Sequence, residues 1–348
     1  MRGQVAAVSA FCSFDSEQKT VISRENLLWH CGKKRIMAQD YPRLLEADRA
    51  EITILVDNYT DLFVPSQKTV DVRPPFALDR PLLAEHGFSC YIVLHAKGKV
   101  HKILMDAGLS SGCMLHNAVQ QKIDLEEIEA VVLSHGHFDH TGGLVPLLMG
   151  AGHQIPLVAH PDAFLRRRLN SPGKDPVDLP QLDAVSLKQA GADLLVRSKP
   201  SLLSAGHLLV TGEIERTVPF EKGFPGMEAW DGKNWVRDLI LDDQGLVINL
   251  KGKGLIIISG CAHAGIINTV RFAQKITGDS HIHAVLGGFH LTGPLFAPVI
   301  GPTIEAMKQI KPDYLVPMHC TGWDAINRFI KEMPENTILN TVGTTYYF

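Results

Sequence analysis

Short apolar runs, separated by polar residues or by glycine and proline, recur along the chain from residue 50 onward. In the first half these runs are three to five residues long, which is typical of buried strands. We expect strands at 52–56, 91–94, 103–105, 130–133 and 156–159. Apolar residues at helical spacing predict helices at 113–121 and 143–150. The first half therefore alternates strands with helices.

The second half of the chain repeats this pattern. Two apolar runs, 246–250 and 255–258, flank a Lys-Gly-Lys-Gly turn and predict a hairpin, into which the run 208–210 leads. Further strands are expected at 284–286 and 314–316, and helices at about 265–277, 302–310 and 323–332. Two comparable β-rich halves, each finished by helices, predict an α/β protein with two mixed sheets packed face to face and helices on both outer faces.

Two long segments, 59–80 and 212–238, show neither the period of a strand nor that of a helix. Long irregular loops in a compact domain are usually functional lids or disordered segments. The second segment combines charged residues with five large apolar side chains, which are Phe220, Phe224, Met227, Trp230 and Trp235. We interpret this mixture as the wall of a substrate pocket, with packing over the edge of the domain as the alternative.

Residues 1–49 are predicted to form an N-terminal segment outside the folded domain, which we place at 50–348. No clear strand or helix period is present before about residue 45, and the apolar stretch 5–12 is too short for a signal peptide. The segment is either a disordered or loosely docked tail, or an over-extended reading frame whose biological start is Met37. In both cases we expect it to be non-catalytic, and mass spectrometry of the native N-terminus would distinguish the two.

The composition is that of an ordinary globular protein, with 45% apolar and 20% charged residues among 348. The net charge of −3 provides no basic field for nucleic acid or an anionic membrane, and no apolar run approaches the length of a membrane span. The tight basic cluster of the predicted folded domain, Arg166 to Arg168, is predicted to lie on the solvated face of a helix. Six cysteines without paired spacing indicate reduced thiols and a cytoplasmic protein. We expect a small-molecule substrate and no nucleic-acid or membrane partner, and homo-oligomerisation stays open.

A dense group of potential metal ligands follows the apolar run 130–133: His135, His137, Asp139 and His140. Nitrogen and oxygen ligands at this density suit zinc, iron or manganese. His135 and His137 are two apart, so in an extended backbone both point to one side and can share an ion. Asp139 and His140 are adjacent and diverge, which suits a second ion. The alternative is a polar loop that happens to be rich in histidine, but the strand before it and the Thr-Gly-Gly turn after it favour a metal site.

Three later histidines repeat this arrangement of a buried strand, a small residue and then a histidine. They are His263, which comes shortly after Cys261, then His290 and His319. Any one of them alone would be read as an ordinary core or surface histidine. Because strand ends at one edge of a layered fold form pockets, the repetition favours His263 and His319 as ligands. For His290, ligation and substrate contact are both kept open.

The pattern His135-x-His137-x-Asp139-His140 resembles the signature of the metallo-β-lactamase superfamily. The later motifs resemble one subgroup, which contains the archaeal 7,8-dihydropterin-6-yl-methyl-4-(β-D-ribofuranosyl)aminobenzene 5′-phosphate synthase. These motifs lie at 85–89, 104–108, 260–265, 287–291 and 319–322. The resemblance covers about residues 50–348 and implies a catalytic domain with the four-layer αββα fold of this superfamily.

The resemblance also implies a site for two divalent metal ions, with zinc favoured over iron or manganese. One ion would be held by His135, His137 and His263, and the other by Asp139, His140 and His319. Cys261 stands where the superfamily usually has a bridging aspartate. A thiolate there would bridge or cap a metal and bias the site toward softer ions, and the alternative is that this replacement leaves one ion weakly held.

Three residues receive other roles by the same resemblance. Asp106 resembles the carboxylate that orients ligands such as His135 by hydrogen bonding, and the alternative is a turn residue at the end of a strand. Asp139 is a candidate catalytic residue as well as a ligand, and His290 is the second candidate. By contrast, His281 and His283 precede the strand at 284–286, and we interpret them as surface residues despite their His-x-His spacing.

The predicted function is that of a metal-dependent enzyme acting on a small phosphorylated or heteroaromatic substrate. In the synthase of this subgroup, the centre would help a pyrophosphate leave while an aromatic carbon attacks the pterin methylene. The alternatives are a hydrolase of a lactone, thioester or phosphodiester, and a non-catalytic metal-binding or regulatory protein. The full set of histidines argues against the non-catalytic alternative, and the acidic balance argues against a nuclease.

Overall fold

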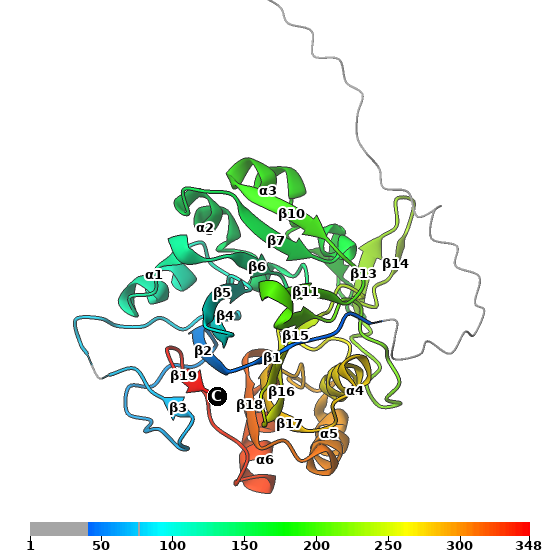
Figure 1. Ribbon diagram of the computed structural model, residues 1–348. Helices are drawn as coiled ribbons and strands as arrows, with labels where there is room; N and C mark the ends of the chain where they lie inside the picture. Colours follow the sequence, from blue (N-terminus) through cyan, green and yellow to red (C-terminus); the bar gives the residue numbers. More distant parts are fainter. Residues whose placement is uncertain (1–40, 76) are drawn as a thin grey trace, which may run out of the picture. The chain divides into compact units, whose positions relative to one another are not determined.

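The computed structural model describes residues 41–75 and 77–348, and within them two mixed sheets face each other (Figure 1). The first sheet has the strand order β10–β7–β6–β5–β4–β2–β19–β3. Its strands are β2 (Arg49–Val56), β3 (Asp71–Val72), β4 (Ser89–Ala96), β5 (Lys99–Met105), β6 (Ala130–Val132), β7 (Ile155–Ala159), β10 (Ala192–Val196) and β19 (Thr345–Tyr347). The strands β5, β6, β7 and β10 run parallel to one another.

The second sheet has the order β11–β12–β15–β16–β17–β18, and β1 pairs with β15 beside this path. Its strands are β1 (Glu46–Ala47), β11 (Ser201–Leu203), β12 (Leu208–Val210), β15 (Gly245–Leu250), β16 (Gly254–Ser259), β17 (Ile282–Gly288) and β18 (Tyr314–Met318). The predicted hairpin is confirmed, because β15 and β16 pair antiparallel across the glycine-containing turn. The strands β16, β17 and β18 are parallel, so their carboxyl ends meet at one edge of the sheet.

Helices cover the outer face of each sheet, which confirms the predicted αββα sandwich (Figure 1). The helices α1 (Cys113–Gln120), α2 (Leu144–Gly150) and α3 (Ala184–Ala190) pack on the first sheet. The helices α4 (Ile266–Thr277), α5 (Ala297–Ile310) and α6 (Trp323–Glu332) pack on the second. Covered on both faces, β6 and most of β16 are runs of buried apolar residues, as expected for strands buried between two layers.

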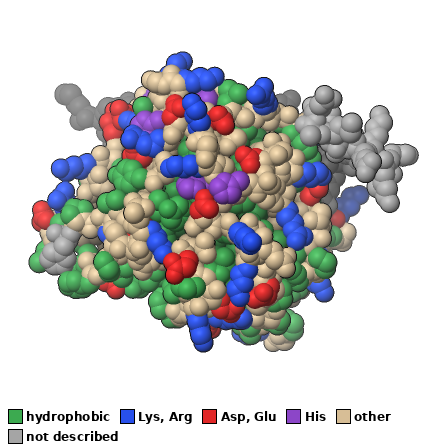
Figure 2. All heavy atoms as spheres, turned by 60° about the horizontal axis from the view of Figure 1, so that its bottom comes forward, with side chains coloured by type: hydrophobic (Ala, Val, Ile, Leu, Met, Phe, Trp, Pro, Cys, Tyr) green, Lys and Arg blue, Asp and Glu red, His purple; other side chains and the backbone are tan. Residues whose placement is uncertain are grey.

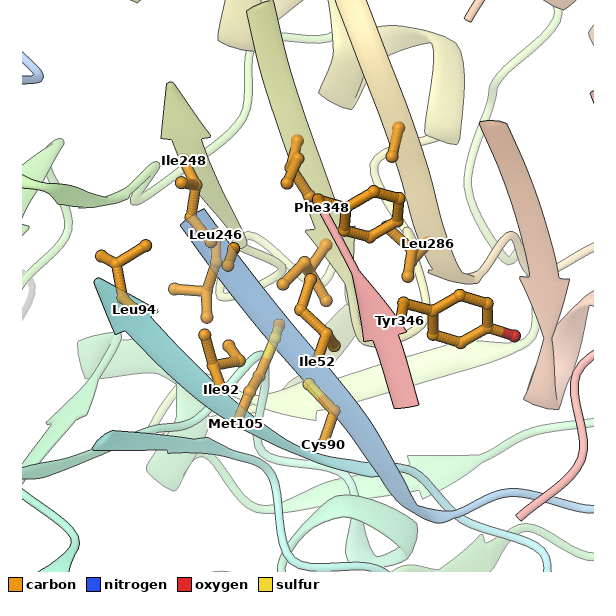
Figure 3. Packing of buried hydrophobic residues seen from close by; sticks show 14 of the residues in the cluster. Ile52, Cys90, Ile92, Leu94, Met105, Leu246, Ile248, Leu286, Tyr346 and Phe348 are labelled. Carbon is orange, nitrogen blue, oxygen red and sulfur yellow. The ribbon is translucent and has the colours of Figure 1, made fainter. Parts of the chain in front are cut away.

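The main core lies between the two sheets (Figure 3). Ile52 and Ile92 of the first sheet pack in the same cluster as Leu246 and Leu286 of the second, and all four are fully buried. The sheets are thus held together by apolar contact, which leaves their strand ends free to carry polar side chains. At about 25 cal/mol for each Å² of buried apolar surface, such a core is the dominant favourable contribution to folding.

A third, smaller sheet corrects two predictions. Its order is β14–β13–β8–β9, with strands β8 (Arg167–Leu169), β9 (Val177–Asp178), β13 (Met227–Trp230) and β14 (Trp235–Arg237). The segment 212–238 is therefore not irregular throughout, because its end forms the hairpin β13–β14. These strands are too short to produce a period that stands out in the sequence.

The arginine cluster lies at and within β8 and not on a helix, so that prediction was wrong. Successive side chains of a strand point to opposite sides. Arg166 and Arg168 accordingly both lie over the ring of Trp235, at 5.1 and 4.3 Å from its centroid. Arg167 points the other way, is 3% exposed, and pairs with the buried carboxylates of Asp238 and Asp242. The central arginine is thus an internal ion partner and not part of a solvated face.

The prediction that His281 and His283 are surface residues holds only for the first. The side chain of His281 is 56% exposed. His283 lies inside β17, is 7% exposed, and its Nδ1 is 2.8 Å from a carboxylate oxygen of Asp313. The strand was predicted at 284–286, but β17 begins at Ile282. His283 is therefore part of this buried strand.

The expected boundary at residue 50 lies among paired strands. Glu46 and Ala47 form β1, and the backbone N–H of Leu45 donates to Gly206. The remainder of the predicted N-terminal segment, residues 1–40, lies outside the described residues, so its nature stays a prediction. Within 41–75 and 77–348, none of the helices is both long and apolar enough to cross a membrane.

Candidate metal centre

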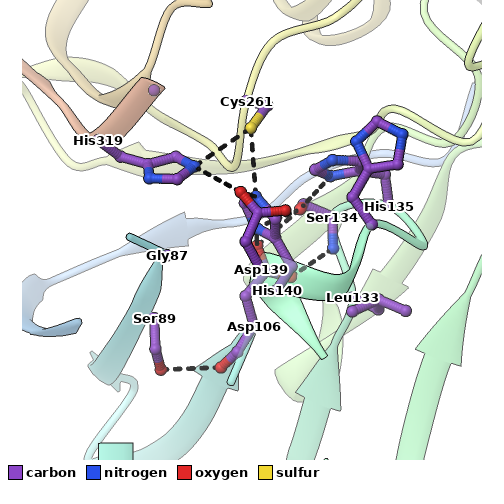
Figure 4. Close-up of polar contacts among 12 residues, drawn as sticks. Gly87, Ser89, Asp106, Leu133, Ser134, His135, Asp139, His140, Cys261 and His319 are labelled. Carbon is purple, nitrogen blue, oxygen red and sulfur yellow. Dashed lines mark hydrogen bonds and ion pairs between the residues drawn. The ribbon is translucent and has the colours of Figure 1, made fainter. Parts of the chain in front are cut away.

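The predicted ligands meet where strands of both sheets end at the same edge (Figure 4). His135, His137, Asp139 and His140 follow β6, and a short 3₁₀ turn at Phe138–His140 directs the last two. Cys261 and His263 follow β16, and His319 follows β18. All seven residues are at most 7% exposed. Buried polar groups at this density require mutual partners or a bound ion.

Three imidazoles form the first cluster. The Nε2 atom of His263 is 3.2 Å from Nε2 of His135 and 3.1 Å from Nδ1 of His137. Nitrogens bound tetrahedrally to zinc, each about 2.0–2.1 Å from the metal, lie about 3.3 Å from one another. The spacing of the three nitrogens therefore fits one zinc-sized cation.

Four side chains form the second cluster. The ligand atoms of Asp139, His140, Cys261 and His319 all lie within 4.8 Å of one another. The Cys261 sulfur is 3.2 Å from Nε2 of His140 and 3.3 Å from Nε2 of His319. Cys261 also lies within 4.8 Å of the ligand atoms of His135 and His263, so its sulfur stands between the two clusters. A thiolate in that place is suited to contact a cation on either side.

Hydrogen bonds on the far side of the rings set which nitrogen faces each cluster. The buried carboxylate of Asp106 accepts from Nδ1 of His140 at 2.7 Å and from the hydroxyl of Ser134 at 2.6 Å. The same hydroxyl oxygen is 2.9 Å from Nδ1 of His135 and accepts from it. Asp106 thus orients His140 directly and reaches His135 only through Ser134. In both rings Nδ1 donates away from the site, so Nε2 is the nitrogen that faces the cluster.

Asn58 orients the ring of His319 by a hydrogen bond to its Nδ1, as Asp106 orients the ring of His140. Its amide oxygen accepts from Nδ1 of His319 at 3.1 Å, and Asp57 accepts from the backbone N–H of His319 at 2.8 Å. Sequence reasoning did not single out either residue, because they lie more than 250 positions from His319. A polar Asp-Asn pair directly after a buried strand was the available signal.

His86 is a further residue at the site that was not predicted. Its Nε2 is 3.4 Å from the Asp139 carboxylate, and its Nδ1 is 3.2 Å from the amide nitrogen of Asn58. Since that amide donates to Nδ1, the proton of a neutral His86 ring resides on Nε2, facing Asp139. The side chain is 56% exposed. Figure 2 shows histidine side chains that reach the surface near the middle of one face, beside acidic side chains.

The electrostatics of the two clusters differ. Burial lowers the pKa of His135 and His263 well below the usual value and that of His137 to about 3, so these rings are neutral and ready to bind a cation. Burial also acts on His140, but Asp139 and Asp106 outweigh it and raise its pKa to about 9. A cation entering the second cluster must therefore displace a proton, so binding there should weaken as the pH falls.

Substituting Asp106 should loosen the second cluster. In Asp106→Asn, the carboxylate that accepts from both His140 and Ser134 becomes a weaker, neutral acceptor. Partners of this kind typically contribute 10- to 100-fold to metal affinity. We therefore expect the affinity of the second cluster for its cation to fall by about that factor. Competition with a chelator measures this. Asp313→Asn, which removes the partner of His283 outside the site, is the matched control and should leave the affinity unchanged.

The loops that carry the ligands are fixed by buried carboxylates. The backbone N–H of Gly136, between His135 and His137, donates to Asp242 at 2.8 Å. Asp243 accepts from the backbone N–H of Ala264 at 2.7 Å, next to His263. A Cβ at position 136 would collide with the backbone of Ala163, so only glycine allows this close approach. Since Asp242 also pairs with Arg167, the small sheet is tied to the first cluster.

An apolar pocket of about 290 Å³ opens beside the clusters. His263 and His290 line it together with Phe224 and Phe296, whose rings stack with centroids 6.0 Å apart. Lys222 and Arg237 add two exposed cations to its lining. Of the five large apolar residues expected to wall a pocket, Phe220 and Phe224 line this one, whereas Met227, Trp230 and Trp235 do not. His290 stands in this wall and lies outside both ligand clusters.

Glu221, also in the pocket lining, should make stability depend on pH. Its carboxylate accepts from the backbone N–H groups of Ile267 and Asn268 at the start of α4. Burial raises its pKa from 4.5 to about 7. Between these values the unfolded chain ionises first, so this group lowers stability by about 3 kcal/mol as the pH rises from 4.5 to 7.

Urea unfolding of the wild type and Glu221→Gln between pH 4.5 and 8 tests this. The variant loses one hydrogen bond to the helix at every pH. This loss lowers its free energy of unfolding by the same amount at each pH. The difference between the two proteins should therefore change only below about pH 7, in favour of the variant as the pH rises. Two parallel curves would contradict the expectation.

Comparisons with known proteins identify the family. A model of the β-lactamase superfamily domain matches residues 101–191. Over 268 residues the chain is 32% identical to the 7,8-dihydropterin-6-methyl-4-(β-D-ribofuranosyl)-aminobenzene-5′-phosphate synthase of Methanocaldococcus jannaschii, covering 74% of this chain and 87% of the synthase. An uncharacterised protein of the same organism is 33% identical over 255 residues, covering 72% of this chain and 89% of that protein.

The fold is also shared with a solved structure. A metal-dependent hydrolase of the β-lactamase superfamily superposes with a TM-score of 0.66 at 22% identity, over 85% of this chain and 98% of the hydrolase. At this identity the likeness concerns the fold, whereas the identity to the synthase extends over most of both chains. The chain therefore belongs to the metallo-β-lactamase superfamily, within the subgroup that contains the dihydropterin-methyl-ribofuranosylaminobenzene phosphate synthase.

Proposed function

We propose that this protein is a two-cation metalloenzyme that acts on a small phosphorylated or heteroaromatic substrate. The observation that carries the proposal is the shared wall of the ligand clusters and the pocket. His263 belongs to the first cluster and also lines the aromatic pocket, so a molecule held there lies beside the cations. The named relative, a synthase for an aromatic phosphate, supports this substrate class.

Two residue sets would hold the cations. His135, His137 and His263 would bind the first; Asp139, His140, His319 and Cys261 would bind the second. When bound, the cations would supply Lewis-acid stabilisation of an anionic oxygen or a departing phosphate group. Zinc suits the mixed nitrogen, sulfur and oxygen ligands best, and iron and manganese are the alternatives.

The remaining residues would bind and orient the substrate. The ring centroids of His290 and Phe296 are 4.8 Å apart, and Phe296 stacks with Phe224. These rings suit the flat apolar face of an aromatic substrate. Lys222 and Arg237 provide charges for a phosphate. Although burial opposes it, His140, His319 and His86 hold the pKa of Asp139 well below its usual value. Asp139 is therefore an ionised carboxylate that can hold a proton donor of the substrate, with His86 beside it to exchange that proton.

Substrate turnover separates the two reaction types. Metal-loaded protein is incubated with a dihydropterin diphosphate and an aminobenzene ribofuranoside phosphate, and pyrophosphate release is measured; a phosphodiester, a thioester and a lactone are run in parallel. Release that depends on both aromatic substrates supports the synthase chemistry. Turnover of the hydrolytic substrates alone would replace it with a metal-dependent hydrolase. No turnover of any of them by metal-loaded protein would contradict the proposed substrate class.

A further inference from the structure

A third group of metal-binding side chains lies next to the two clusters. Cys261, His290 and Cys320 follow β16, β17 and β18, the three neighbouring parallel strands whose ends share one edge. Their two sulfurs and an imidazole nitrogen all lie within 4.8 Å of one another. Cys261 is 2% exposed and Cys320 is 4% exposed. Thus each of three adjacent strands contributes one soft or borderline ligand to the same small volume.

The backbone around this group makes room for it. Gly288, on the middle strand, has no side chain, and a Cβ there would lie 2.6 Å from the Cys320 sulfur and would collide with the carbonyl of Gly260. His290 adopts a left-handed backbone conformation with φ of 46°, which is costly for a residue with a side chain. Strained backbone persists where the surrounding structure holds it in place, and it concentrates at functional sites.

One side chain of the group also has a buried nitrogen without a hydrogen-bond partner among the described residues, which is Nδ1 of His290. The Cys320 sulfur contacts the carbonyl of Cys261 at 3.6 Å and also interacts with the side chains of Cys261 and His290. Leaving a buried polar atom unpaired is unfavourable, so Nδ1 of His290 favours a bound partner. Cys90 differs, because it packs in the apolar core between the sheets and belongs to none of the ligand groups found among the described residues.

We propose that Cys261, His290 and Cys320 form a third cation site, with two sulfur ligands and one nitrogen ligand. Three protein ligands of this kind hold catalytic zinc with a fourth position left open. His290 also lines the aromatic pocket, so the open position would face the bound molecule. Thiolate ligands select soft or borderline cations such as Zn²⁺ and Cd²⁺ and disfavour Mg²⁺ and Ca²⁺. This goes beyond the two-cation function, because Cys261 would serve all three positions.

Cadmium binding to the full chain tests the third site. All proteins carry Cys12→Ser and Cys31→Ser, so that only the four described cysteines remain. Each is freed of metal with a chelator and titrated with Cd²⁺, while native mass spectrometry counts bound ions and ultraviolet absorption follows the charge transfer from thiolate to cadmium. The parent protein should bind three ions.

Cys320→Ser should bind two ions and lose part of the thiolate absorption, and Cys90→Ser, the matched control, should bind three. Circular dichroism verifies that each variant is folded, and His290→Asn, expected to bind two ions, provides a second variant should Cys320→Ser fail to fold. A parent protein that saturates at two ions, or folded Cys320→Ser that still binds three, would overturn the third site. A parent protein that binds fewer than two ions would instead contradict the two-cation proposal.

Discussion

His263→Ala is expected to remove one cation from each chain and to lower the affinity of the first cluster by more than about 100-fold, the upper end of what supporting residues alone contribute. The reason is geometric. Nε2 of His263 is the atom common to both short distances in this cluster, 3.2 Å to His135 and 3.1 Å to His137. Without it, two nitrogens remain, and the further ligand within reach, Cys261, is shared with the second cluster.

Metal analysis of protein purified without chelator measures the loss, and activity toward whichever substrate is turned over should fall with it. His281→Ala is the control, because its side chain is 56% exposed and lies outside the clusters. His319→Ala should remove the other cation by the same argument, since its Nε2 contacts both Cys261 and Asp139. If His263→Ala kept the full metal content, the assignment of the first cluster would be wrong.

Arg167→Met is expected to destabilise the folded protein by about 3–5 kcal/mol, which is the usual cost of removing one partner from a buried ion pair. Arg167 donates from Nε to Asp238 at 2.6 Å and from a terminal nitrogen to Asp242, and all three side chains are at most 6% exposed. Methionine fills a similar volume but leaves two buried carboxylates without their cation. Urea unfolding measures the loss, which is a large fraction of the stability of a typical domain.

Arg166→Met is the matched control on the adjacent residue. Arg166 pairs with Asp178, and both side chains are more than half exposed, so the change should cost less than about 1 kcal/mol. Arg167→Lys keeps the charge but cannot donate in two directions from a planar group. Its loss of stability should lie between those of Arg166→Met and Arg167→Met. Metal affinity offers a second readout, because Asp242 holds Gly136 between two ligands of the first cluster. Equal stability of Arg167→Met and Arg166→Met would contradict the role of the buried network.

The elements that the sequence predicted well are those with a long local signal. Apolar runs located the central strands, and helical spacing located the helices α1, α2, α4, α5 and α6. The candidate ligands after β6 could be proposed from the sequence, because four of them lie within six residues and alternate in a way that local backbone geometry explains. His263 and His319 could be added because each follows a buried strand.

What could not be predicted depends on contacts between distant segments. The small sheet consists of strands of two to four residues, which are too short to show a period, so Arg167 was placed on a surface helix. Asn58 and His319 are 261 positions apart, and His86 reaches Asp139 from another strand end. Nothing in the local sequence links such residues, since only the packing of the sheets brings them together.

The layered fold and the candidate ligand types could therefore be inferred from the sequence alone, because apolar periodicity and dense polar clusters are local properties of a chain. The tertiary structure decided how those ligands divide between two clusters, and that Cys261 lies between them with Cys320 and His290 on its other side. The physical reason is that parallel strands align their ends at one edge, whereas the order of strands within a sheet follows from packing across the core.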